Sequence, residues 1–178
     1  RMAALLSGEL DFVLDPPVQD VERLKKQKSV RVYEGRENRV VFLGMDQQRN
    51  ELLYSNVKGR NPFKDRRVRE AMYRLIDVNA INKSVMRGLS VPTAINLPNP
   101  DRAGIPKDMD KRYPHDVAAA KRLLAEAGYP NGFEVTLDCP NNRYINDEKI
   151  CVALAGMVAK GGITMKVNAQ PRAQYFPK

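Results

Sequence analysis

The clearest periodic pattern in the chain lies between Asn61 and Asp77. Apolar residues recur there at intervals of three and four, which places them on one face of an α-helix; they are Val68, Met72, Leu75 and Ile76. Pro62 cannot continue a helix from before it, and Asp65 offers a carboxylate that can cap the first turn. The pattern therefore predicts a helix that begins after Asp65.

Further helices are predicted from shorter apolar patterns and their capping residues. They span about 3–6, 19–28, 79–87, 116–127 and 147–160. Glycine commonly follows a helix end because it adopts positive φ without strain, and Gly88, Gly128 and Gly161 occupy that place. Asn79 is the expected cap of the helix that ends at Gly88.

Short runs of β-branched and aromatic residues, bounded by turn-forming residues, predict strands. They lie at 11–14, 30–33, 39–43, 133–137 and 163–167. Strands that alternate with helices are typical of an open mixed sheet flanked by helices, so the predicted fold class is α/β. The proline-rich stretch 89–115 has almost no periodicity, and we expect a long ordered loop there.

The composition is that of a globular protein. Of the 178 residues, 43% are hydrophobic and 29% are charged, proportions that differ from those of disordered chains. A chain of this length can bury a hydrophobic core without support from disulfides or metals. No apolar run approaches the roughly 18 residues that a membrane-spanning helix needs.

Positive charge is in excess, because Lys and Arg number 30 against 21 Asp and Glu, for a formal net charge of +9. Such an excess favours an anionic partner. The basic residues of the helix after Asp65 are Arg66, Arg67, Arg69 and Arg74. They do not form one stripe, and Glu70 stands at the spacing from Arg74 that favours an ion pair. A surface that follows phosphates needs a continuous basic face, so a solvated amphipathic helix is the better interpretation, and a basic nucleic-acid-binding module is the alternative.

Few residues offer catalytic or metal-binding chemistry. His115 is the single histidine, it has no nucleophile near it in the sequence, and no carboxylates stand at the spacing of common zinc sites. The glycines are scattered at turns and helix ends rather than gathered in a phosphate-binding loop. We therefore expect a protein that is not an enzyme and that has no metal site and no cofactor.

Two cysteines flank a polar loop. Cys139 lies near the end of a predicted strand, and Cys151 lies in the first turns of the next helix. In a reducing compartment they would remain free thiols, whereas in an oxidising compartment they can form a disulfide. Closing a loop of this size would stabilise the fold by about 3 kcal/mol in the chain-entropy model.

The loop between the cysteines holds the best candidate ligand groups. Two amides, a guanidinium and a phenol follow the predicted strand; they belong to Asn141, Asn142, Arg143 and Tyr144. Open α/β sheets bind ligands beyond the carboxyl ends of their strands, and Arg143 can hold a ligand carboxylate through two parallel hydrogen bonds. The same residue types are common in solvated turns, so that simpler interpretation stays open at this point.

Several segments of the chain, taken in order, resemble one family. They are SGELDFVLDPPVQDVERL, NPFKDRRVREAMYRLIDVNAI, VMRGLSVPT, AAKRLLAEAGYPNGFEVTL and GGITMKVNAQPRAQYFPK. Together they are similar to the extracellular solute-binding proteins of peptide-type ABC importers, family 5. The resemblance covers nearly the whole chain.

The resemblance implies a protein of two lobes, type II-like, that closes on a peptide or a similar small solute and delivers it to ABC permease subunits. Such a protein is periplasmic, or extracellular and anchored to the membrane, and nucleic acid is not its partner. Chains of the family are much longer, so residues 1–178 are expected to form a single α/β lobe, a C-terminal-lobe fragment without the first lobe. The opening residues, which begin a helix without a capping residue, are in keeping with that expectation. A ligand-sensing domain of a regulator is a further alternative.

The resemblance also assigns roles to individual residues. Arg143 matches an arginine that faces the ligand carboxylate in dipeptide-binding relatives, and Asn141, Asn142 and Tyr144 share its loop. Met45 and Asp46 follow a predicted strand at a place where relatives often have Phe-Asn or Tyr-Asn near the cleft, and this sequence departs from that pattern. An oxidising compartment favours the disulfide between Cys139 and Cys151.

Overall fold

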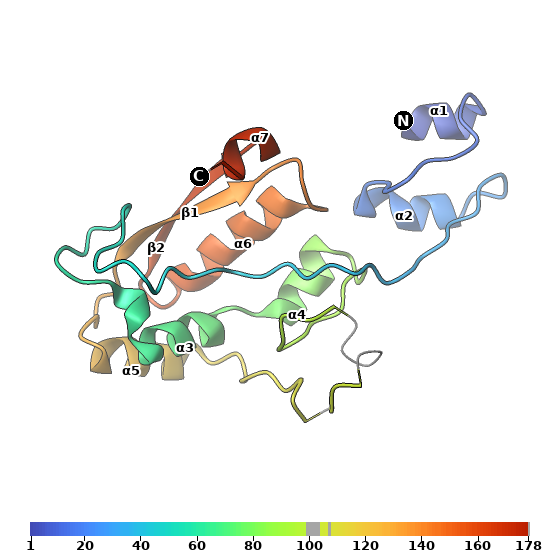
Figure 1. Cartoon of the computed structure of the whole chain (residues 1–178). Helices are drawn as coiled ribbons and strands as arrows, with labels where there is room; N and C mark the ends of the chain where they lie inside the picture. Colours follow the sequence, from blue (N-terminus) through green and yellow to red (C-terminus); the bar gives the residue numbers. More distant parts are fainter. Residues whose placement is uncertain (99–103, 107, 178) are drawn as a thin grey trace.

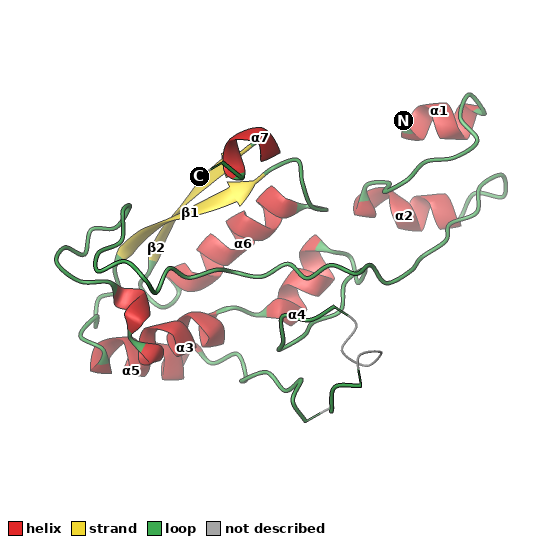
Figure 2. Ribbon diagram, viewed as in Figure 1, coloured by secondary structure: helices red, strands yellow, loops and turns green. Residues whose placement is uncertain are grey.

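The computed structural model describes residues 1–98, 104–106 and 108–177 of the chain. The fold is α/β, as predicted, with helices around a small sheet (Figures 1 and 2). The helical elements are α1 (Met2–Ser7), α2 (Val18–Lys25), η1 (Pro62–Lys64), α3 (Arg66–Leu75), α4 (Val78–Ala80), η2 (Ile81–Val85), α5 (Val117–Glu126), α6 (Asp147–Ala159) and α7 (Arg172–Tyr175). The strands are β1 (Glu134–Pro140) and β2 (Thr164–Gln170).

The helix predicted after Asp65 is confirmed as α3. The side chain of Asp65 accepts a hydrogen bond from the backbone N–H of Arg67, which is the expected cap. The buried residues of α3 are Val68, Ala71, Met72 and Leu75. This face packs against α5, and the side chain of Asp116 caps α5 in the same way.

The cap of the next helix was predicted wrongly. Asp77, not Asn79, caps α4, because its carboxylate accepts a hydrogen bond of 2.9 Å from the N–H of Ala80. The helix then widens into the π-helical turn η2. Gly88 follows with a φ of 81°, as expected for the residue after a helix end.

The sheet consists of β1 and β2, which lie side by side and parallel in the described part of the chain. Glu134 pairs with Thr164 where the strands begin, and Pro140 pairs with Gln170 where they end. Helix α6 connects the two strands and packs against both. Its buried residue Val158 belongs to the main hydrophobic core, to which β1, α3 and α5 also contribute.

Two turns touch where the strands begin. Gly132 precedes β1 with a φ of 73°, and Gly162 precedes β2 with a φ of 93°, both in the region that favours glycine. A Cβ atom on Gly132 would lie 1.9 Å from the carbonyl oxygen of Gly162, far inside any permitted contact. The two backbones therefore pack directly on each other, and this contact aligns the first residues of the strands.

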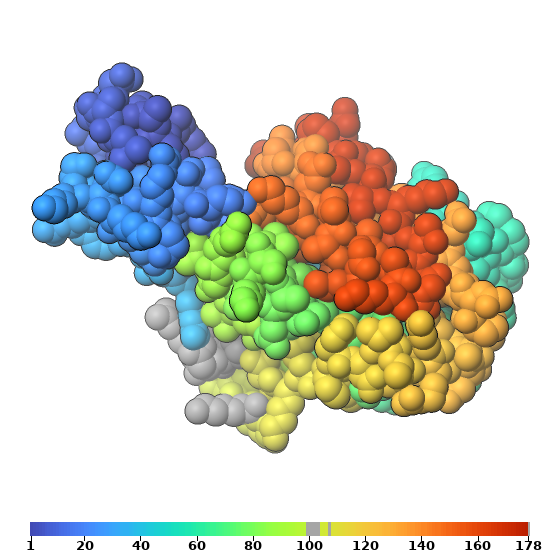
Figure 3. Space-filling view, turned by 180° about the vertical axis from the view of Figure 1, so that it is seen from behind, coloured from blue at the N-terminus to red at the C-terminus, as the bar shows by residue number. Residues whose placement is uncertain are grey.

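The N-terminal helices stand apart from the main core. Val18, Val21 and Leu24 on α2 are buried, but within the described residues the main cluster and its packed neighbours begin only at Leu43. In the space-filling view the blue N-terminal part projects from one side of the molecule (Figure 3). A side-chain hydrogen bond joins it to the body, where Nε2 of Gln19 donates to Oδ1 of Asn146 at 3.4 Å.

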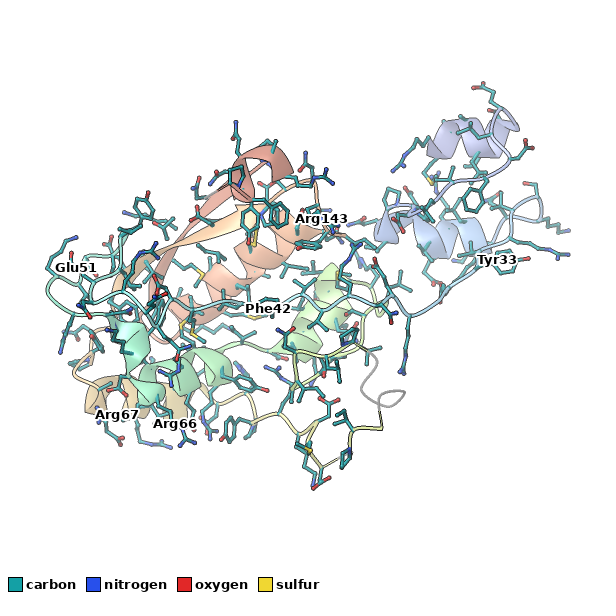
Figure 4. The ribbon with its side chains drawn as sticks, viewed as in Figure 1. Tyr33, Phe42, Glu51, Arg66, Arg67 and Arg143 are labelled. Atoms are coloured by element: carbon teal, nitrogen blue, oxygen red, sulfur yellow. A yellow bond between two sulfur atoms is a disulfide. The ribbon has the colours of Figure 1, made fainter. Side chains whose placement is uncertain are left out.

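Three predicted strands, at 11–14, 30–33 and 39–43, are not formed, and those predictions were wrong. Phe12, Tyr33 and Phe42 in these segments are 76%, 85% and 67% exposed; Figure 4 labels Tyr33 and Phe42. A strand is stabilised by the ladder with its neighbour. Where the chain is described, β1 and β2 pair with each other, and Ser55 adds one antiparallel bridge to β1. The three segments have the composition of strands, but no strand pairs with them within the part of the chain that the structure describes.

The long loop predicted at 89–115 contains no helix or strand among its described residues, and 99–103 and 107 lie outside them. Its later part is held against α3 by aromatic contacts. The ring of Tyr113 lies 5.7 Å from that of Tyr73, and the guanidinium of Arg112 lies 4.1 Å from the centre of the Tyr73 ring. The loop is packed onto the body rather than a free spacer.

Candidate functional site

The candidate ligand loop lies where the sequence predicted it, directly after the carboxyl end of β1. Asn141 and Asn142 are exposed, and Arg143 and Tyr144 are half-buried. The backbone N–H of Asn141 donates to the carbonyl of Gln170 at the end of β2. Oδ1 of Asn142 accepts a hydrogen bond of 2.7 Å from the backbone N–H of Arg172, so the loops that follow both strands are joined.

The guanidinium of Arg143 stacks on a neighbouring ring and has no acidic partner among the described residues. It lies 4.9 Å from the centre of the Tyr144 ring, and no carboxylate of the described residues forms an ion pair with it. Arg39, from the extended segment that passes the loop, lies 5.5 Å from the same ring. Arg39 is paired with Glu37 at 2.5 Å, so Arg143 contributes the positive charge without an acidic partner among the described residues, and such a charge favours an anionic or polar ligand group. Figure 4 shows Arg143 at the end of the body that faces the N-terminal helices.

Asp147 organises this loop, which the sequence had indicated only as the start of a helix. Its side chain is buried, with 7% of the residue exposed. Oδ2 accepts hydrogen bonds from the backbone N–H groups of Arg143 and Tyr144, at 2.9 and 3.0 Å, and Oδ1 accepts one from Glu148. A carboxylate at the start of a helix, preceded by a polar loop, is the signal that indicates such a role.

Asn146 ties the same loop to the body. It adopts a φ of 54°, in the left-handed region, and its Nδ2 donates a hydrogen bond of 2.8 Å to the carbonyl of Val85. Its side chain also meets Gln19 of α2. The loop is therefore held by hydrogen bonds to Asp147 within it, and its Asn146 is held by contacts with η2 and α2.

Cys139 and Cys151 form a disulfide in the structure, with their Cα atoms 6.5 Å apart. Cys139 is fully buried on β1, and Cys151 lies in the second turn of α6. The bond joins the strand before the loop to the helix after it. Asn141 through Asn146 thus lie within a covalently closed segment.

Met45 and Asp46 are not brought together with this loop. Met45 packs against the main core. Asp46 accepts hydrogen bonds from the backbone of Gln48 and Arg49, and the side-chain hydrogen bond from Arg49 lowers the pKa of its carboxyl group. Its carbonyl accepts a hydrogen bond from the side chain of Asn61. These contacts hold a turn near Glu51, which Figure 4 shows at the opposite end of the body from Arg143.

A polar cluster that the sequence did not indicate lies on the sheet itself. Oδ1 of Asp138 on β1 accepts hydrogen bonds from Asn168 and Gln170 on β2, at 2.7 and 3.1 Å. These residues face away from the side of β1 on which Cys139 meets α6. Residues that pair across two parallel strands lie on the same face of the sheet. Once the register was known, this rule could have located the cluster of Asp138, Asn168 and Gln170.

Three of the four arginines of α3 are engaged in internal contacts, and the fourth, Arg66, is exposed at its start. Arg67 binds the carboxylate of Asp65 and donates to the carbonyl of Glu126. Arg69 donates to the carbonyls of Phe63 and Lys64. Arg74 pairs with Glu70 at 2.9 Å, so the helix does not present a continuous basic face.

The described residues form neither a metal centre nor a membrane-spanning helix. Within the described ranges, no group of three His, Cys, Asp or Glu side chains is placed to hold a metal ion. No helix among those residues combines the length and the apolar composition needed to cross a membrane.

The fold and the loop together define a class of protein. An α/β sheet with a loop of hydrogen-bonding groups and an available arginine beyond the carboxyl end of a strand is typical of α/β ligand-binding proteins. The family model described as "Bacterial extracellular solute-binding proteins, family 5 Middle" matches residues 1–178. The chain therefore belongs to family 5 of the bacterial extracellular solute-binding proteins, as its motifs predicted.

Individual relatives support this assignment. Heme-binding protein A of Haemophilus influenzae is 33% identical over 134 residues, which cover 75% of this chain and 22% of the relative. Glutathione-binding protein GsiB of Shigella flexneri is 29% identical over 174 residues, which cover 98% of this chain and 31% of the relative. The periplasmic binding protein DppA of Helicobacter pylori, solved with the peptide STSA, superimposes with a TM-score of 0.81 at 26% identity over 98% of this chain and 31% of that one. The chain thus spans less than a third of the length of these relatives.

Proposed function

We propose that the chain is part of the solute-binding component of an ABC importer, which binds a peptide or a similar small solute and delivers it to a membrane permease. The observation that carries this proposal is the Arg143 guanidinium, which has no acidic partner among the described residues and lies beyond the carboxyl end of β1. The carboxylate of a peptide or of a tripeptide such as glutathione is the complementary group. The relatives named for glutathione and solved with a peptide support the same class of ligand.

The site is proposed to comprise Arg143, Asn142, Tyr144 and Asn141. Met45 and Asp46, which the family pattern also suggested, engage in contacts that stabilise a distant turn, so their proposed role is structural in this lobe. Hollows elsewhere on the described surface are lined by Tyr54 and Lys166, or by Arg60 and Tyr129, and do not include the loop. A second lobe that covers the loop would complete the binding cleft.

The proposed setting of the protein follows from its family. Residues 1–178 would form one α/β lobe, whose main core begins at Leu43. A first lobe would supply the other half of the cleft, and ABC permease subunits would receive the solute. The proposed location is the periplasm, or the outer surface with a membrane anchor. This setting is oxidising, and the disulfide of Cys139 and Cys151 accords with it.

Replacement of Arg143 tests the proposed site. In the full-length protein, Arg143→Ala should weaken the binding of a peptide or of glutathione by about 2 to 3 kcal/mol, the value of a charge-assisted pair. This corresponds to a roughly 30- to 150-fold higher Kd by isothermal titration calorimetry. Arg66→Ala is the matched control, because it removes the same group from the exposed start of α3 and should leave the Kd unchanged.

The outcomes separate the proposal from its alternatives. Unchanged affinity in Arg143→Ala would remove Arg143 from the site. A protein that binds no peptide and no glutathione, but binds generic DNA with a steep dependence on salt concentration, would instead be the basic nucleic-acid-binding module. Solute binding by a chain that also carries a DNA-binding domain would indicate the sensing domain of a regulator.

A further inference from the structure

We propose that Asp147 is a positioning residue for the solute site, which fixes the backbone of Arg143 and Tyr144 without touching the solute. The inference rests on the function proposed above. It concerns a residue that neither the family pattern nor the sequence assigned to the site. Asp147 is 7% exposed, so its carboxylate cannot reach a solute that lies against the loop.

The geometry shows what the carboxylate does. A single oxygen, Oδ2, accepts the backbone N–H of Arg143 and that of Tyr144, while Oδ1 accepts the N–H of Glu148 in the first turn of α6. A buried carboxylate is costly unless it is hydrogen-bonded, and these donors satisfy it. The start of a helix also favours a negative charge. The loop is thus folded around Asp147, and two successive peptide units have their orientation set by one atom.

This orientation matters for binding. The backbone positions of Arg143 and Tyr144 set where their side chains start and so where the guanidinium and the ring can lie. The guanidinium carbon already lies 4.9 Å from the centre of the ring. A loop held in this shape before binding does not have to be ordered by the solute, whereas a free loop would lose affinity to that ordering. Asn146 holds the other end of the loop through Val85, so removal of Asp147 should release the Arg143 end without detaching the whole segment.

Asp147→Asn is the decisive variant, because it keeps the volume of the side chain and removes its charge and one strong acceptor. Asp116→Asn is the matched control, since Asp116 is also a helix-starting carboxylate, which accepts the N–H of Ala119 at 2.8 Å on α5. Both variants should lose some stability, but only Asp147→Asn should affect the loop. Asp147→Ser, which keeps an oxygen that can start the helix, serves if the Asn variant fails to fold.

The measurement is a double-variant cycle in the full-length protein, with the peptide Ser-Thr-Ser-Ala and reduced glutathione as probes. Asp147→Asn should raise the Kd on the order of tenfold in the wild-type background. In the Arg143→Ala background the same substitution should raise the Kd by a clearly smaller factor, on the order of threefold, because one of the two side chains that it positions is gone while Tyr144 remains. Hydrogen exchange of residues 141–146 should quicken in Asp147→Asn and not in Asp116→Asn.

Each result decides one point. Equal losses of affinity with and without Arg143 would overturn the positioning role and assign the effect of Asp147 to general stability. Unchanged affinity and unchanged exchange in Asp147→Asn would also overturn it, while leaving the proposed function standing. A wild-type protein that binds neither probe would refute the proposed function, and the role of Asp147 in binding would fall with it.

Discussion

Replacement of Gly132 by alanine should destabilise the protein more than any other single methyl group added at a turn of the sheet. The added Cβ would lie 1.9 Å from the carbonyl oxygen and 2.3 Å from the carbonyl carbon of Gly162. Both contacts are with backbone, so no side chain can rotate away. Either the turn before β1 or the turn before β2 must move.

The expected magnitude combines three contributions. Alanine at a φ of 73° costs about 1 to 2 kcal/mol relative to glycine. The steric overlap adds about 1 to 3 kcal/mol, the usual cost of forcing an extra carbon into a packed site. The lower entropy of the unfolded alanine chain returns about 0.4 to 1 kcal/mol. The net loss should therefore be about 3 kcal/mol in the free energy of unfolding.

Equilibrium unfolding in urea, followed by circular dichroism, measures this loss as a lower midpoint with an unchanged slope. Gly156→Ala is the control, because Gly156 lies within α6 and a Cβ there meets nothing within 4 Å. Alanine in a helix interior should stabilise the protein by about 0.5 to 1 kcal/mol. If Gly132→Ala stays within about 0.5 kcal/mol of the wild type, as an ordinary surface substitution does, the direct contact of the two turns is refuted.

Two further predictions concern stability. Replacing Cys139 and Cys151 together by serine should lower the free energy of unfolding by about 3 kcal/mol. The oxidised protein should also gain two mass units on reduction. Two alkylatable thiols in freshly secreted protein would contradict the disulfide. Asp65 has its pKa lowered, chiefly by the side-chain hydrogen bond from Arg67, so its stabilising effect is present above the ordinary Asp pKa of about 3.9 and is lost as the pH falls through the lowered value. Asp65→Ala should thus lower the free energy of unfolding by about 1 kcal/mol at pH 7 and by progressively less in acid, as measured by urea unfolding. An equal loss at pH 7 and below the lowered pKa would argue against the ion pair with Arg67.

The helices were predictable because their signals are local. Asp65 and Asp116 each cap the helix that follows, and the apolar spacing of α3 matches its buried face. Asn79 was a reasonable cap by residue type, but the carboxylate of Asp77, two residues earlier, reaches the N–H of Ala80 first. The choice between two competing caps depends on the exact path of the chain, which residue type alone does not give.

The strands were less predictable because each one needs a partner. The segment 39–43 has the composition of a strand, yet Phe42 is 67% exposed and the segment is extended without a strand ladder. Composition indicates that a segment is suited to a sheet, and the partner is a property of the whole fold. Strands β1 and β2 pair because α6, which connects them, brings the start of β2 back beside the start of β1.

The candidate site shows the same limit. The loop with Arg143 was found from its residue types and its place after a strand, but Asp147 was assigned only to the start of a helix. Its role depends on the chain turning back by four residues, so that one oxygen meets two N–H groups. The place of Asp46, in a turn with Arg49 and Asn61 rather than in this loop, likewise depends on how the extended segment crosses the body, which no local pattern records.

The contact of Gly132 with Gly162 has a consequence at the other end of the sheet. The strands keep one register over their whole length, from Glu134 with Thr164 to Pro140 with Gln170, and a slip by one residue would shift one strand end by about 3.3 Å. The hydrogen bond that joins Asn142 to the loop after β2 would then be broken. If the loop after β1 binds the solute as proposed, substitutions at this turn should change the affinity from roughly 20 Å away, although the turn itself carries no candidate binding residue.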